Sequence, residues 1–277
     1  MKRILILVLL LIAGIGVYSQ ENDHSKELNI AYYGNTITQS DKYISEKCLL
    51  DIYYPAKEKN FPTIIWFHGG GLTGGDKAMP KGLLKKGYCV VSVNYRLYPK
   101  VKCPVYLQDA AAAVAWVFNN IKKYGGNPDL IFVTGHSAGG YLTSMIGLDK
   151  KWLAANSIDA NKIAGLFPLS GNGITHQAIR DEKGISKMTP WADEYSPLFH
   201  VRADAPPFIL MTGDRELEYI GRYEENAYLA RMMKLVGHKE TVLYEFDGYG
   251  HSNTIPAFPL LFKWVNTITE RIKKEQK

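Results

Sequence analysis

Residues 130–140 of the chain read LIFVTGHSAGG. The first five residues form a compact apolar run that predicts a buried strand, and Ala138–Leu148 has the pattern of a helix. A Ser between them, within G-x-S-x-G, is typical of a sharp strand-to-helix turn that exposes a hydroxyl over a sheet. The alternative is a helix N-cap Ser followed by closely packed glycines. Ser137 is therefore a candidate nucleophile.

Strands and helices alternate on both sides of this turn. Strands are expected at Cys48–Tyr54, Phe61–Phe67, Tyr88–Asn94, Leu130–Thr134, Ile163–Leu169, Phe208–Thr212 and Thr241–Phe246. Helices are expected at Lys81–Lys86, Leu107–Lys123, Ala138–Leu148, Tyr223–Val236 and Phe258–Lys274. This alternation predicts an α/β fold with a mostly parallel central sheet covered by helices on both faces. A polar, turn-rich stretch at 171–197 interrupts the pattern, and we expect a short lid there or a surface loop.

The N-terminal segment has the features of an export signal. Two basic residues follow Met1, and an apolar run extends from Ile4 to Ile15 before the chain turns polar. The run is too short to cross a bilayer comfortably. We expect a signal peptide at 1–19, a leader at 20–46 and one catalytic domain at 47–277. The mature protein would then be periplasmic or extracellular, without a stable membrane anchor.

Composition bounds the partners of the chain. The 277 residues are 46% hydrophobic, which is enough for one sizeable core. The formal net charge is only +6, and no basic stripe is interleaved with aromatic residues, so we expect no nucleic-acid partner. Cys89 lies in an apolar run, where a buried free thiol is expected. Export permits a Cys48–Cys103 disulfide, but the sequence does not assign one, nor the oligomeric state. The cysteine spacing matches no zinc site, and we expect no metal or cofactor.

A glycine-rich segment follows the strand expected at Phe61–Phe67. It reads HGGG at residues 68–71. Consecutive glycines let a backbone approach a ligand closely and supply N–H donors to a developing oxyanion. We assign Gly70, Gly71 and the N–H of Ala138 to an oxyanion hole. An ordinary glycine-rich turn is the alternative.

A general base and its acid partner are expected after later strands. His251 lies in a glycine-rich loop just past Thr241–Phe246, which fits the order Ser, acid, His of this fold. The strand at Phe208–Thr212 leads into Asp214 and Glu216. A triad acid holds the imidazole in one tautomer and balances the imidazolium that forms, and either carboxylate can do so.

Together these motifs resemble the hormone-sensitive-lipase-like branch of the α/β-hydrolase family. The resemblance is greatest to small exported bacterial esterases, including carbohydrate, feruloyl and acetyl esterase-like members. It rests on HGGGLTGGDK at 68–77, NYRL at 94–97, Asp109, GHSAGG at 135–140, YSPL at 195–198 and GYGH at 248–251. The family places its acid three residues after the glycine that ends the strand, which favours Glu216, although an Asp is usual there. Asp214 would then cap the turn.

The resemblance implies a serine esterase that works through an acyl-enzyme on Ser137, without a metal. Acyl groups on carbohydrates outside the cytoplasm are the expected substrates, and Asn94 and Arg96 would brace the oxyanion loop. Leu72, Met188 and Trp191 are candidates for the substrate pocket. Two alternatives stay open, namely a peptidase or amidase of the same fold and a non-catalytic binding protein on a hydrolase scaffold.

Overall fold

The structure is a computed structural model that describes residues 23–219 and 221–276. The signal peptide expected at 1–19 lies outside these residues. Within them, no helix combines the length and apolar character needed to span a membrane.

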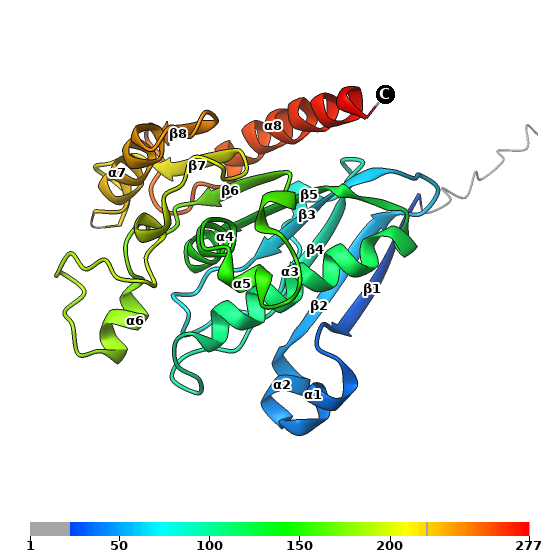
Figure 1. Ribbon diagram of the computed structural model, residues 1–277, viewed down its shortest axis with the longest axis horizontal. Helices are drawn as coiled ribbons and strands as arrows, with labels where there is room; N and C mark the ends of the chain where they lie inside the picture. Colours follow the sequence, from blue (N-terminus) through cyan, green and yellow to red (C-terminus); the bar gives the residue numbers. More distant parts are fainter. Residues whose placement is uncertain (1–22, 220, 277) are drawn as a thin grey trace, which may run out of the picture.

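A single eight-stranded sheet forms the centre of the molecule, in the order β1-β2-β4-β3-β5-β6-β7-β8 (Figure 1). Strands β3 to β8 run parallel, whereas β1 and β2 pair antiparallel at one edge. The strands are β1 His24–Ala31, β2 Leu49–Pro55, β3 Phe61–Phe67, β4 Cys89–Val93, β5 Gly126–His136, β6 Gly165–Leu169, β7 Phe208–Gly213 and β8 Thr241–Phe246. The expectation of a mostly parallel sheet is confirmed.

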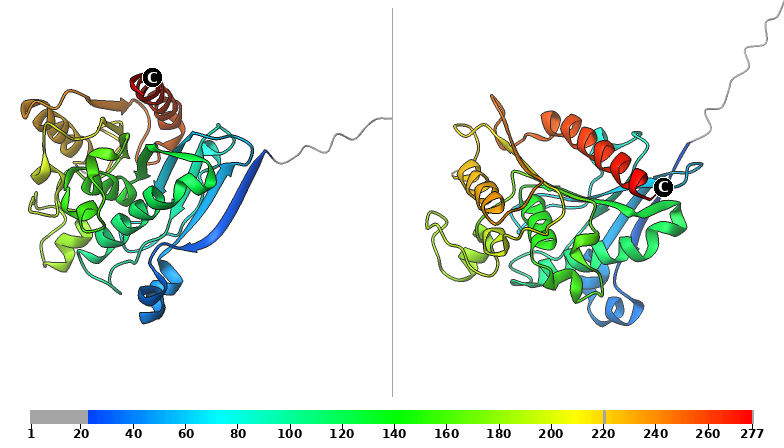
Figure 2. Two further views of the ribbon diagram at one scale, coloured as in Figure 1. Left: turned by 45° about the vertical axis from the view of Figure 1, so that its right-hand side comes forward. Right: turned by 45° about the horizontal axis from the view of Figure 1, so that its top comes forward.

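Helices cover both faces of this sheet (Figures 1 and 2). Helices α3, α4 and α7 pack into the core of one face, and α8 packs with the short helix η1 on the other. The helices are α1 Asn35–Ser40, α2 Lys42–Lys47, α3 Val105–Tyr124, α4 Ala138–Leu148, α5 Lys151–Ala154, α6 Gln177–Glu182, α7 Arg222–Leu235 and α8 Thr254–Glu275, with 3₁₀ turns η1 Lys81–Leu83, η2 Ala160–Lys162 and η3 Pro197–His200. The central strands β3 and β4 are buried along their whole length, because both of their faces are covered.

The N-terminal region differs from the expected leader. Strand β1 pairs with β2, and α1 and α2 follow before the strand predicted from Cys48, so the sheet begins well before residue 47. The sequence of β1 shows no apolar alternation, because its four central residues are exposed. This edge strand is held by backbone pairing. The helix predicted at Lys81–Lys86 is only the 3₁₀ turn η1. The three cysteines are free thiols.

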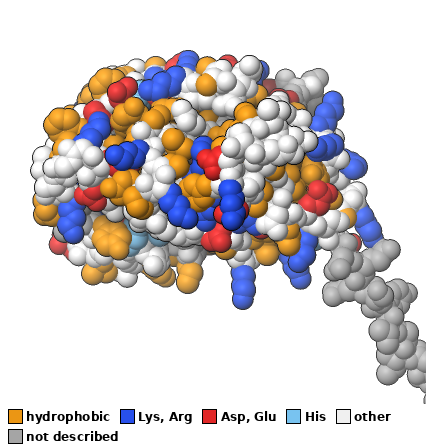
Figure 3. Space-filling model, turned by 90° about the horizontal axis from the view of Figure 1, so that it is seen from below, with side chains coloured by type: hydrophobic (Ala, Val, Ile, Leu, Met, Phe, Trp, Pro, Cys, Tyr) orange, Lys and Arg blue, Asp and Glu red, His pale blue; other side chains and the backbone are white. Residues whose placement is uncertain are grey.

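The stretch at 171–197 leaves the sheet after β6 and carries the short helix α6, which projects from the body of the molecule (Figure 1). On the face seen in Figure 3, basic, acidic and hydrophobic side chains are interspersed, and no continuous basic stripe crosses it.

A buried ion pair fixes the segment after β4 to helix α3. The Asp109 carboxylate is fully buried and accepts two hydrogen bonds from the Arg96 guanidinium, at 2.7 and 2.9 Å. It also accepts from the Arg96 backbone N–H and from the Tyr33 hydroxyl. The four donors compensate the desolvation of the carboxylate, and removing it would leave a largely buried guanidinium without its partner.

We expect Asp109→Ala to lower the free energy of unfolding by about 3–5 kcal/mol, measured by urea denaturation. Glu46→Ala is the matched control, because Glu46 forms an ion pair with Lys42 in which both side chains are well exposed. That control should cost less than about 1 kcal/mol. Equal losses for the two variants would contradict this account of the buried pair.

Candidate active site

Ser137 occupies a strained turn between β5 and α4. Its backbone has φ 58° and ψ −116°, a conformation that non-glycine residues rarely adopt. The neighbouring glycines allow the chain to pass: a Cβ on Gly139 would lie 2.1 Å from the Phe67 carbonyl oxygen, and one on Gly135 would lie 2.6 Å from Gly139. The hydroxyl is thus placed at the carboxyl edge of the parallel strands, at the N-terminus of α4.

The glycine-rich segment after β3 lies directly beside this serine. A Cβ on Gly69 would come within 3.4 Å of the Ser137 Cβ. Gly70 has φ 111°, and a side chain there would collide with the Gly74 carbonyl at 2.2 Å. In the described part of the chain, the N–H groups of Gly70, Gly71 and Ala138 have no hydrogen-bond acceptor. These three donors therefore have no acceptor among the described residues, and their role in an oxyanion hole stays a prediction.

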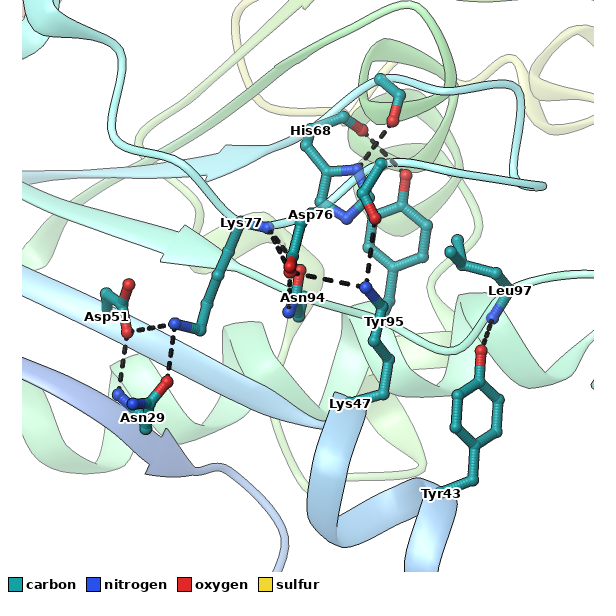
Figure 4. Close-up of polar contacts among 12 residues, drawn as sticks. Asn29, Tyr43, Lys47, Asp51, His68, Asp76, Lys77, Asn94, Tyr95 and Leu97 are labelled. Carbon is teal, nitrogen blue, oxygen red and sulfur yellow. Dashed lines mark hydrogen bonds and ion pairs between the residues drawn. The ribbon is translucent and has the colours of Figure 1, made fainter.

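A network of side chains holds the glycine segment in place (Figure 4). The His68 ring stacks on Tyr95 at 4.4 Å between centroids, and the Tyr95 hydroxyl donates to the His68 carbonyl. Asn94 accepts from the Lys77 N–H at 2.5 Å and donates to the Asp76 carboxylate. Asn94 therefore braces the segment, as expected, whereas Arg96 binds Asp109.

The His251 imidazole lies next to the residue that precedes the nucleophile. The rings of His136 and His251 are 4.7 Å apart, and His136 Nε2 lies 2.6 Å from the His251 carbonyl oxygen. Since a carbonyl oxygen only accepts hydrogen bonds, His136 Nε2 carries the proton. Burial lowers the pKa of His136 and keeps its ring neutral. His136 thus ties the loop of His251 to the turn of Ser137.

The acid partner of His251 is Glu218, so the expectation of Glu216 or Asp214 is corrected. Glu218 Oε1 lies 2.5 Å from His251 Nδ1, and its side chain is 0% exposed. Glu216 is exposed at the surface. Asp214 caps the turn: its carboxylate accepts from the N–H groups of Glu216 and Gly248, both at 2.9 Å. Only Glu218 reaches the imidazole.

Four donors surround the Glu218 carboxylate. Besides His251, it accepts from the Ser170 hydroxyl at 2.5 Å and from the N–H groups of Gly213 and Tyr219. Ser170 is oriented by Asn253 Nδ2, 2.7 Å from its Oγ. Burial opposes the charge of Glu218, but the hydrogen bonds from His251 and Ser170 outweigh it and hold its pKa at about 2. The carboxylate is therefore ionised at neutral pH.

Sequence reasoning missed Glu218 because of local turn geometry. Acidic residues stand at 214, 216 and 218, and nothing in their spacing distinguishes them. The turn becomes helical after β7, where the N–H of Glu218 donates to the Asp214 carbonyl at 2.8 Å. This turn places Glu218 beside His251 and leaves Glu216 exposed. The presence of three candidate acids was the only available signal.

A pocket of about 300 Å³ lies beside these groups. Two of its lining residues, Gln177 and Tyr219, connect it to the site. A Cβ on Gly71 would lie 3.9 Å from Gln177 Nε2, and the rings of Tyr219 and His251 are 4.3 Å apart between centroids. Its lining residues are Asn172, Gln177, Arg180, Lys187, Met188, Tyr219, Arg222 and Glu225.

Of the three predicted pocket residues, the structure places only Met188 in this lining. Leu72 is fully buried in the core, with φ 61°, and Trp191 donates to Asp193 outside the pocket. The arginines, Tyr219 and Glu225 were not anticipated. Between residues 23 and 276, apart from 220, no group of three or more His, Cys, Asp or Glu side chains could hold a metal ion.

Comparisons with known proteins place this geometry in context. The probable carboxylic ester hydrolase LipM of Mycobacterium tuberculosis is 29% identical over 55% of this chain and 40% of its own length. The esterase LipC of the same organism is 26% identical over 73% of this chain and 56% of its own. The chain spans about half the length of these curated relatives.

Solved structures share the fold. A truncated carbohydrate esterase from gut microbiota superposes with a TM-score of 0.73 at 21% identity, over 90% of this chain and 98% of that one. Esterase B from Lactobacillus rhamnosis superposes with a TM-score of 0.69 at 19% identity, over 92% of this chain and 89% of that one. The expected α/β-hydrolase fold is confirmed. The BD-FAE family model matches residues 50–195, more than half of the sequence, and the chain belongs to this family of α/β-hydrolases.

Proposed function

We propose that this protein is a serine esterase that hydrolyses carboxylic esters through an acyl-enzyme on Ser137. The observation that carries the proposal is the hydrogen bond between His251 and the buried Glu218, in a structure that also places a strained Ser137 beside the glycine segment. The similarity to LipM, LipC and Esterase B supports the same reaction class.

The mechanism follows from the proton positions. Glu218 accepts the Nδ1 proton of His251, so Nε2 of the neutral ring is left as a base. Ser137 Oγ attacks the acyl carbon while its proton passes to Nε2, and the carbonyl electrons move to an oxyanion that the N–H groups stabilise. Collapse expels the alcohol, which takes the proton from His251. A water molecule then repeats the sequence on the acyl-enzyme and releases the acid.

The proposed substrates are acyl esters of carbohydrates outside the cytoplasm. Two observations support this choice. One structural neighbour is a carbohydrate esterase and another is a bifunctional GH43-CE protein from Bacteroides eggerthii, at 19% identity and a TM-score of 0.68. The N-terminal sequence has the features of an export signal, and export favours large external substrates.

The protein should release acid from 4-nitrophenyl acetate and from acetylated or feruloylated oligosaccharides, measured by absorbance and chromatography. Ser137→Ala should lower kcat on the order of 10⁶-fold, because the nucleophile is removed. It should also abolish labelling by a fluorophosphonate probe.

Ser144→Ala is the matched control, because Ser144 is a buried serine of α4, the helix that follows Ser137, and its hydroxyl donates to the Gly140 carbonyl at 3.2 Å. Persistent labelling of Ser137→Ala would refute the nucleophile. Hydrolysis of the nitrophenyl ester with none of the carbohydrate esters would remove the carbohydrate assignment alone.

Glu218→Gln should lower kcat by about 10²–10⁴-fold on the same esters, because a Gln amide can donate to Nδ1 and fix the wrong tautomer. Glu218→Asp should restore part of the rate. Since the pKa of Glu218 is about 2, its carboxylate stays ionised from pH 5 to 9, and its own titration should add no pH dependence to the loss.

Glu216→Gln and Asp214→Asn provide the comparison, because both residues stand in the same turn without contacting His251. Glu216→Gln should stay within about twofold of the wild type, as expected of an exposed side chain. A larger loss for Glu216→Gln than for Glu218→Gln would overturn this assignment.

Expression with the natural N-terminus in a bacterial host should deliver the protein to the periplasm or medium, with a mature N-terminus near Gln20 by sequencing. A variant lacking residues 2–19 should remain in the cytoplasm. Recovery of a chain beginning at Met1 from the cytoplasm would contradict export.

A further inference from the structure

The pocket beside His251 contains two buried guanidinium groups that the mechanism above does not use. Arg180 is 4% exposed and Arg222 is 3% exposed, and both line the pocket. They come from different segments: Arg180 lies in α6, within the excursion at 171–197, and Arg222 begins α7. Burying a guanidinium is costly unless its donors are matched by acceptors.

The protein matches these donors only in part. Arg180 Nη1 donates to the Thr189 carbonyl at 2.6 Å, and Arg222 Nη1 donates to the Ser170 carbonyl. The Nε atoms of both arginines are buried, and neither has a hydrogen-bond partner within the described residues. Two guanidinium groups whose donors are matched only in part within the described residues therefore line one cavity, although they come from two segments.

The two carboxylates nearby accept hydrogen bonds from other groups, although Glu225 also forms an ion pair with Arg222. Glu225 Oε2 accepts from Asn172 Nδ2 and the Gly173 N–H at 3.1 and 3.0 Å, and it lies 3.9 Å from Arg222 Nε. Burial raises the pKa of Glu225, because desolvation opposes its charge. Glu218 is bound to His251. The lining thus has one carboxylate against two buried arginines and the exposed Lys187 at its rim.

Burial also lowers the pKa of Arg222, because desolvation opposes its charge. An anion in the pocket would add acceptors for the guanidinium groups that line it. A guanidinium suits a planar carboxylate, to which it donates in parallel. A monoanion fits better than a phosphate dianion, since the Glu225 carboxylate faces the same space.

We propose that the ester hydrolysed at Ser137 carries a carboxylate, which binds in this pocket between Arg180 and Arg222. Substrates of this class are half-esters of dicarboxylic acids and acyl esters of acidic sugars. The inference rests on the proposed esterase function and adds its substrate class. The pocket adjoins the site through two of its lining residues, Gln177 next to Gly71 and Tyr219 on the His251 ring.

Two pairs of esters test the proposal on the wild-type protein, followed by pH-stat titration at pH 7.5. Monomethyl adipate against methyl hexanoate places the charge on the acyl side, and 4-acetoxybutanoate against butyl acetate places it on the alcohol side. The charged member of at least one pair should have the higher kcat/KM by about tenfold or more. The preference should weaken as salt is raised.

Arg180→Gln should lower the charged-to-neutral ratio of kcat/KM by about tenfold or more, because one of the two guanidinium groups is lost. Arg231→Gln is the matched control, since Arg231 is an exposed arginine of α7 away from the pocket lining. Its ratio should equal that of the wild type. A wild type that prefers both neutral esters, or a ratio unchanged in a folded Arg180→Gln protein, would overturn the proposal.

A binding measurement separates this inference from the proposed function. Adipate should raise the Tm of the Ser137→Ala protein, whereas the isosteric 1,6-hexanediol should not. This change in Tm also tests the proposed anion site if Arg180→Gln fails to fold. If the wild type hydrolyses no ester and resists the fluorophosphonate, the esterase function fails, while a rise in Tm with adipate would still support the anion site. Equal shifts with adipate and hexanediol would refute it.

Discussion

The backbone at Ser137 is the constraint on which the site depends. A left-handed residue between a buried strand and a helix costs about 1–3 kcal/mol and persists only where the surroundings enforce it. Here the enforcement is steric and local, because Gly139 lies against the Phe67 carbonyl with no room for a Cβ. The same contact brings the end of β3, and hence the glycine segment, beside the serine. One close approach of backbones therefore positions both the nucleophile and the oxyanion donors.

The second half of the site is electrostatic. Glu218 is a fully buried carboxylate, and such a charge is tolerated only when hydrogen bonds replace the lost water. Its donors come from the ends of β6 and β7, from Tyr219 and from the loop after β8, so the acid holds three segments of the sheet edge together as it orients His251. His136 closes the arrangement by binding the His251 carbonyl. Stability and proton transfer thus use the same hydrogen bonds.

The excursion at 171–197 acquires a role from this arrangement. It was expected to be a lid or a surface loop, and it supplies Asn172, Gln177, Arg180, Lys187 and Met188 to the pocket. The lining of the pocket includes two arginines and a lysine, against a single carboxylate. Its charge is local: the arginines belong to its walls, while the face in Figure 3 mixes both signs.

The sequence by itself determined the strands from β2 onward, the turn at Ser137, and the positions of the glycine segment and of His251 after their strands. These follow from short-range signals, namely apolar runs, glycines at fixed offsets and chain order, which each act within about ten residues. Tertiary structure decided the acid, because a helical turn after β7 rather than residue spacing selects Glu218 among three acids. It also decided β1, whose residues pair without burying an apolar face, and the arginine pocket, whose walls lie some forty positions apart in α6 and α7. Such contacts depend on where distant segments meet, and no local pattern encodes that meeting.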